Sequence, residues 1–182
     1  MLLLYFVAAG VAIGLLARGD LDRLAAVRVS WAPVAIAGLV FQVVLFSGPV
    51  SSAVGSWGPA LYVGSTAIVL LALLRNLEHP GFRLIALGAA LNLVAILAYG
   101  GQMPASVEAY RLLTGHEPVP SDGFSNSVVA PWGSPLLWLG DVFVLPRPIP
   151  LANVFSIGDV FIGLGGCLFI VRVMGGTPPA RT

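Results

Sequence analysis

The chain has 182 residues, of which 58% are hydrophobic and 9% are charged, with a net charge of +1 and a mean hydropathy of +0.95. This balance is typical of an integral membrane protein and excludes a soluble domain. The near-neutral charge offers no basic surface for nucleic acid. The single cysteine, Cys167, excludes an internal disulfide and a cysteine-based metal site.

Five apolar runs predict membrane-spanning helices, each close to the roughly 17–20 residues that a helix needs to cross a bilayer. The first run carries Gly10 and Gly14, which allow close packing within the bundle or against a partner. We therefore expect an all-α, polytopic transmembrane helix bundle, a single domain over residues 1–182. The predicted helices cover residues 2–17, 32–46, 59–74, 82–99 and 153–174.

The arginines predict the orientation, because the chain contains no lysine. Two arginines lie in the long connector 100–152, and the other seven lie on the opposite side of the predicted helices. The positive-inside bias places the N-terminus and the connector outside and the C-terminus in the cytoplasm. A secretory signal peptide is not expected, since the positive charges follow the first apolar run instead of preceding it. The seven are Arg18, Arg23, Arg28, Arg75, Arg83, Arg172 and Arg181.

Polar side chains interrupt the apolar runs near their outer ends. At about 1.5 Å of rise per residue, Asn92 and Asp159 are expected about 10 and 9 Å below the outer surface. A carboxylate in hydrocarbon is costly unless it is paired or hydrated, so the pattern indicates a polar pocket open to one side. The alternatives are hydrogen bonds that join helices, or an Asp159 that is hydrated at the interface. The polar set is Gln42, Ser65, Thr66, Asn92, Ser156 and Asp159.

The connector 100–152 is too long to be a simple link. Gly100 and Gly101 allow positive φ angles and a close approach of the backbone, and a short amphipathic helix is expected over 105–114 with Gly115 as its stop. Residues 117–127 indicate an irregular loop. Residues 135–146 lie between prolines and are too few to span, which predicts a re-entrant or interfacial element with Trp132 and Trp138 at headgroup level. An apolar lid without chemistry is the alternative.

A four-residue sequence occurs twice in the second half of the chain, and we call this repeat the echo. The four residues Gly-Asp-Val-Phe at 140–143 recur at 158–161. Transporters can show such repeats between their halves, but coincidence in a chain rich in Val, Phe and Gly is the slightly preferred explanation. If the echo is meaningful, Asp141 and Asp159 form a carboxylate pair that shares a proton or holds a hard cation. No other residue completes a metal site. The candidate pocket residues are Asp159, Asn92, Gln42, Ser156, Asp141 and Gln102.

An ordered series of motifs runs through the second half of the chain: Asn92, Gly100-Gly101-Gln102-Met103-Pro104, Leu139-Gly140-Asp141 and Ser156-Ile157-Gly158-Asp159. This series resembles a family of small bacterial five-helix membrane proteins, a domain of unknown function, over essentially the whole chain. Members read Asn-Gly-Gly-x-Met-Pro at the second motif, whereas Tyr99 stands at the asparagine position here. The resemblance implies a protein of the bacterial cytoplasmic membrane and supplies no activity, substrate or cofactor.

Three classes of function fit these observations. The preferred one is a binding or accessory subunit whose outer pocket holds a lipid headgroup, a small ligand or a partner membrane protein. The second is a membrane-embedded enzyme acting on a lipid-linked or anionic substrate at the outer leaflet. Asp141 and Asp159 would be its acid–base or metal-holding groups, and Arg111 or Arg147 would steady an anionic headgroup. The third, a small-solute or proton transporter, is less favoured because the apolar inner halves of the helices leave no polar route across.

Overall fold

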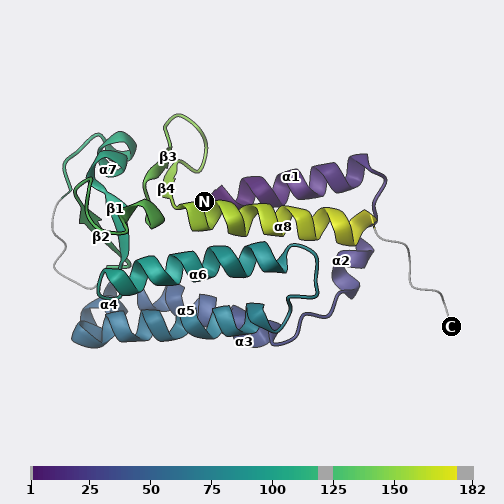
Figure 1. Cartoon of the computed structure of the whole chain (residues 1–182), viewed down its shortest axis with the longest axis horizontal. Helices are drawn as coiled ribbons and strands as arrows, with labels where there is room; N and C mark the ends of the chain where they lie inside the picture. Colours follow the sequence, from purple (N-terminus) through teal and green to yellow (C-terminus); the bar gives the residue numbers. More distant parts are fainter. Residues whose placement is uncertain (1, 119–124, 176–182) are drawn as a thin grey trace.

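The computed structural model describes residues 2–118 and 125–175, and the fold is mostly helical (Figure 1). Four of the five long helices begin and end within one residue of the predicted ranges, whereas the last begins four residues later than predicted. The five are α1 (Leu2–Leu16), α3 (Ala32–Leu45), α5 (Gly58–Leu74), α6 (Phe82–Ala98) and α8 (Ile157–Gly175). Two stretches are long and apolar enough to cross a membrane, namely Gly48–Leu74 with 27 residues and Ile157–Gly175 with 19.

The long helices pack side by side in an order that differs from their order in the sequence. Helix α1 packs on α8, α8 on α6, α6 on α5, and α5 on α3. Figure 1 shows α8, the last helix, between α1 and α6. The first and last long helices of the chain are therefore neighbours.

Small residues bring the backbones of these helices close together. A Cβ atom added to Gly88 of α6 would overlap the carbonyl oxygen of Gly158 in α8. Helix α1 packs on the other face of α8. A Cβ atom added to Gly14 of α1 would lie 2.5 Å from the Met174 Sδ atom, and one added to Gly10 would lie 3.1 Å from the Cys167 Cα atom. Of the two expected uses of Gly10 and Gly14, the structure shows packing within the chain's own bundle.

The two ends of the helices carry different structures (Figure 1). One end holds α2 (Asp22–Ala26) and the α5–α6 turn, and the other holds α4 (Gly48–Val54), the short 3-10 helix η1 (Gly55–Trp57) and the connector. At the first end, the buried Asn76 side chain accepts a 2.7 Å hydrogen bond from the Ser30 N–H and donates a 2.8 Å bond to the Ser30 carbonyl. The Arg23 guanidinium donates to the Met174 carbonyl at 3.3 Å. These bonds tie the loops of this end to one another and to α8.

The connector contains strands, which corrects the all-α expectation. Strands β1 and β2 pair in parallel, and β3 and β4 pair antiparallel. Strands of three or four residues are too short to show a period of their own, so tertiary contacts and not local sequence decide them. The connector elements are β1 (Met103–Ser106), α7 (Val107–Thr114), β2 (Ser127–Ala130), the 3-10 helix η2 (Leu137–Leu139), β3 (Phe143–Leu145) and β4 (Asn153–Phe155).

Backbone conformations at the start of the connector agree with the sequence-based expectation. Gly100 and Gly101 have φ angles of 66° and 89°, and Gly115 ends α7 with a φ of 77°. Helix α7 begins two residues later than expected, because the Ser106 side chain caps it by accepting a 3.0 Å hydrogen bond from the Ala109 N–H. Of the expected irregular loop 117–127, residues 119–124 lie outside the described residues, and its last residue begins β2.

The segment 135–146 folds back onto the ends of α6 and α8 through η2, whose Leu137 and Leu139 are buried. Leu139 joins a small core with Ala95 and Ile96 of α6 and Met103 of β1. Trp132 and Trp138 remain 68% and 60% exposed. The segment is thus a 3-10 turn followed by a strand, with an apolar side on the helices and a tryptophan-bearing outer surface.

Candidate functional site

The start of α8 is fixed by two of the predicted site residues. The Ser156 hydroxyl accepts a 3.0 Å hydrogen bond from the Asp159 N–H, and one Asp159 carboxylate oxygen accepts a 3.2 Å bond from the Ser156 N–H. This reciprocal pair is a capping box, with Ser156 at the N-cap and Asp159 three residues later. It corrects the predicted helix start at Asn153, which lies in β4, and places Ser156 before the helix instead of one turn inside it.

Asn92 of α6 completes a closed set of hydrogen bonds with this cap, which we call the polar ring (Asn92, Ser156 and Asp159). The Ser156 hydroxyl donates to the Asn92 side-chain oxygen at 2.8 Å, and the Asn92 amide nitrogen donates to Asp159 at 3.0 Å. Gly158 has no side chain to separate the two helices here, since a Cβ atom would overlap the Asn92 oxygen. The polar ring therefore joins α6 to the first turn of α8, which is the helix-joining role weighed as the alternative to a pocket.

Asp141 lies within electrostatic range of Asp159 in the polar ring, and its backbone is bonded to β1. Its N–H donates to the Pro104 carbonyl at 2.8 Å, and its carbonyl accepts a bond from the Ser106 N–H at 3.1 Å, so it pairs with β1. The preceding residue, Gly140, has no room for a Cβ atom against the Pro104 carbonyl. These contacts attach the Gly140-Asp141 segment to the strand that follows the paired glycines.

The Asp141 carboxyl differs in environment from Asp159. Burial, and next the charge of Asp159, raise the pKa of Asp141 from 3.8 to about 7. Within residues 2–118 and 125–175, no group donates a hydrogen bond to its side chain, whereas the Asp159 carboxylate accepts two. Of the two carboxyls, Asp141 is therefore the one whose side chain accepts no hydrogen bond from the described residues.

The structure also places Tyr62 of α5 at this site, a residue that the sequence reasoning did not select. Tyr62 packs on the small core beneath the connector and lies within electrostatic range of both Asp141 and Asp159. A tyrosine in an apolar run is usually part of a core or an interfacial belt, so the type of residue alone carries no signal. Its carbonyl accepts hydrogen bonds from Ser65 and Thr66, which were selected.

The remaining two candidates lie apart from the polar ring. The Gln42 side chain of α3 donates to Ser65 at 3.1 Å and to Thr66 at 3.3 Å, so it joins α3 to α5. The Gln102 side chain donates to the Ser125 carbonyl at 2.9 Å, which connects the two segments leading into β1 and β2. The six predicted residues are thus divided among three places, with Asn92, Ser156, Asp159 and Asp141 at one of them.

The two copies of Gly-Asp-Val-Phe adopt different structures. The first runs from the end of η2 into β3, and the second lies in the first turns of α8. The repeated sequence is therefore no structural repeat, although its two aspartates, Asp141 and Asp159, lie within electrostatic range of each other. Among the described residues, no group of three or more His, Cys, Asp or Glu side chains is arranged to hold a metal ion.

The family resemblance rests on segments that meet at this site. They are those of the polar ring, of Asp141 and of β1 with the glycine pair that precedes it. No curated protein and no solved structure matches the chain. A family of unknown function, DUF5317, matches residues 26–171, which include every residue of this site. The match covers most of the chain, and the protein belongs to the DUF5317 family.

Proposed function

We propose that the protein is an integral protein of the bacterial cytoplasmic membrane that binds a cationic ligand, or a cationic group of a partner membrane protein, at its extracytoplasmic end. The observation that carries the binding proposal is the convergence there of the polar ring and Asp141 from separate parts of the chain. Asp141 offers a carboxylate that no described side chain occupies.

The membrane proposal is supported by the exposure of the apolar helices. In the most apolar 18 residues of each long stretch, only 17% of Gly48–Leu74 and 28% of Ile157–Gly175 is buried. The core helix of a soluble protein is mostly buried. On the shorter helices, Leu16 is 85% exposed and Val43 is 74% exposed. Exposed apolar surface on this scale requires a partner, and lipid is the partner that covers all the helices at once.

The proposed orientation is supported by the separation of the two ends. The arginine-bearing segments around α2 and the α5–α6 turn lie at one end of the helices, and the connector lies at the other (Figure 1). The positive-inside bias assigns the first end to the cytoplasm. Asp141 and the polar ring then lie at the outer end.

Cysteine labelling tests this topology with two exposed glutamates as matched positions. In a Cys167→Ser background, Glu117→Cys in the connector should react with a membrane-impermeant maleimide on intact spheroplasts. Glu78→Cys, in the α5–α6 turn, should react only after lysis. The reverse pattern would overturn the orientation, and equal reaction at both positions would overturn insertion in the membrane.

The binding proposal is tested by thermal unfolding of the detergent-purified full-length protein with Mg²⁺, ethanolamine or spermidine. At least one of these probes should raise the unfolding temperature at pH 8 and lose its effect at pH 5.5. The reason is that the pKa of Asp141 lies at about 7, so the carboxyl is charged only at the higher pH.

Variants assign the effect to the site. Asp141→Asn and Asp159→Asn should abolish the shift, because each removes a charge while keeping the size of the side chain. Glu117→Gln, an exposed carboxyl in the same connector, should leave the shift unchanged. A shift that survives in both aspartate variants, or no shift with any of the three probes, would contradict the proposal.

A further inference from the structure

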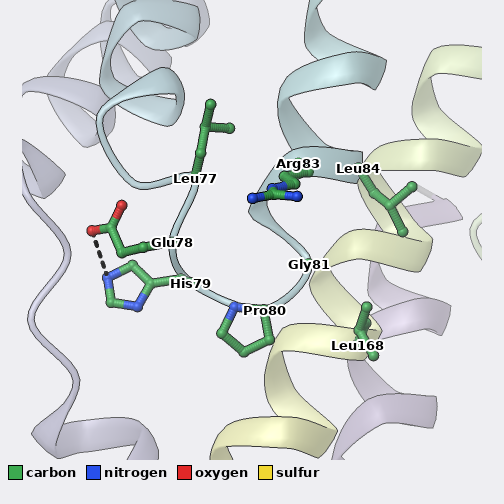
Figure 2. Close-up of a pocket in the computed structure, with 8 residues that line it drawn as sticks. All are labelled: Leu77, Glu78, His79, Pro80, Gly81, Arg83, Leu84 and Leu168. Carbon is green, nitrogen blue, oxygen red and sulfur yellow. Dashed lines mark ion pairs between the residues drawn. The ribbon is translucent and has the colours of Figure 1, made fainter.

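A pocket lies on the α5–α6 turn, at the opposite end of the helices from the polar ring. Its volume is about 320 Å³, and it is open to the surface. Figure 2 shows the Glu78 and His79 side chains extending from one arm of the turn and Arg83 from the other arm. The lining residues are Leu77, Glu78, His79, Pro80, Gly81, Arg83, Leu84 and Leu168.

The charged groups of this pocket are only partly paired. A Glu78 carboxylate oxygen lies 3.8 Å from His79 Nε2, which is an ion pair when the imidazole is protonated, and the Glu78 side chain is 66% exposed. Arg83 has no ion-pair or hydrogen-bond partner among the residues that the structure describes. The pocket therefore presents a carboxylate and a free guanidinium at two separate places on its wall.

The wall also has an apolar part. Leu84 of α6 and Leu168 of α8 line the pocket, and Leu168 is 36% exposed. Their helices continue away from the turn as apolar surface that faces outward, for example at Leu87 and Leu164, each 45% exposed. A ligand that fills the pocket can thus extend an apolar portion along the helices.

We propose that this pocket binds the headgroup of a phospholipid that carries both a phosphate and a primary ammonium group. Arg83 would bind the phosphate, because a guanidinium donates paired hydrogen bonds to phosphate oxygens. Glu78 would accept hydrogen bonds from the ammonium group, and the acyl chains would lie along Leu84 and Leu168. A headgroup without an ammonium group would leave Glu78 facing the phosphate, which is repulsive. The proposal rests on the membrane placement proposed above, in which this end faces the inner leaflet.

Native mass spectrometry of the full-length protein tests the lipid preference. The protein is mixed with equal amounts of dioleoyl phosphatidylethanolamine, phosphatidylcholine and phosphatidylglycerol. We expect the ethanolamine lipid to bind about tenfold more than the other two, since one charge-assisted hydrogen-bonded contact distinguishes them. Arg83→Gln and Glu78→Gln should each remove this preference. Arg172→Gln, an exposed arginine in the last turn of α8, and Glu117→Gln in the connector should retain it.

Four outcomes would overturn the assignment. These are equal binding of the ethanolamine and choline lipids, a preference for the glycerol lipid, an equal loss of preference in Arg172→Gln, and displacement of the lipid by an equal concentration of soluble phosphoethanolamine. The last would mean that the free headgroup, and not a lipid, is the ligand. Labelling at Glu117 and Glu78 keeps the two proposals distinguishable, because it reports insertion and orientation whether or not the pocket selects a lipid.

Discussion

Substituting Gly158→Ala is expected to lower the free energy of unfolding by about 3 kcal/mol, the upper part of the range for overpacking a tight interface. The added Cβ atom would overlap the Asn92 side-chain oxygen and lie 2.7 Å from the Gly88 carbonyl oxygen. The Asn92 side chain cannot swing away without breaking its bonds to Ser156 and Asp159, and the Gly88 carbonyl is part of a helix backbone. The substitution therefore separates α6 from α8 and opens the polar ring.

Gly166→Ala is the matched control, because it makes the same change in the same helix. Nothing lies within 4 Å of a Cβ atom at Gly166. Alanine favours a helix over glycine by up to about 1 kcal/mol, so this variant should be as stable as the wild type or slightly more stable. Thermal unfolding of both variants in one detergent measures the difference. Equal loss of stability in the two would contradict the close contact between Gly158 and α6.

Substituting Asp141→Asn is expected to stabilise the protein above pH 7 and to remove part of its pH dependence. The pKa of this carboxyl is raised from 3.8 to about 7, so the folded protein holds a proton that the unfolded chain releases at lower pH. In the wild type, the resulting stabilisation is complete below about pH 4 and is lost as the pH rises to about 7. Asparagine stays neutral throughout, so its advantage over the wild type should grow across that range. The upper limit of this stability advantage of Asp141→Asn is about 4 kcal/mol, from the difference between a pKa of 3.8 and one of about 7.

Unfolding temperatures measured from pH 4 to pH 8 test this expectation. The curves of the wild type and of Asp141→Asn should meet at the acidic end and diverge towards pH 8. Asp22→Asn, which removes an exposed carboxyl in the first turn of α2, should not reproduce the growing advantage of Asp141→Asn towards pH 8. Parallel curves for wild type and Asp141→Asn would show that the carboxyl is not in the buried, like-charged environment described here.

The long helices could be predicted from sequence because each apolar run ends at a clear break, such as Pro80-Gly81 before α6. The start of α8 was wrong because the apolar pattern continues back through Val154 and Phe155 into β4. The signal that would have corrected it was present, since serine followed three residues later by an acidic residue is typical of a capping box. The strands were not predictable in this way, since β1 and β2 are separated by twenty residues and pair only in the folded connector.

Part of the candidate site could also be predicted from sequence. Polar residues in apolar runs are conspicuous, so Asn92 and Asp159 could be selected, and the repeated Gly-Asp drew attention to Asp141. Their depth alone could not show which helices are neighbours, and so Gln42 was grouped with Asn92 and Asp159 although its side chain bonds Ser65 and Thr66 instead. Tyr62 was missed because only the fold brings it within electrostatic range of Asp141 and Asp159. Its position in the apolar run gives no sign of this.

The position of α8 between α1 and α6 has a consequence for how the protein is made. Of the five long helices α8 is synthesised last, so α1 is without its principal neighbour until α8 has been made. Helix α8 then packs between two helices that have already been synthesised. Its glycine contacts and the polar ring form only at that moment, so the docking of α8 completes the packing of the five long helices.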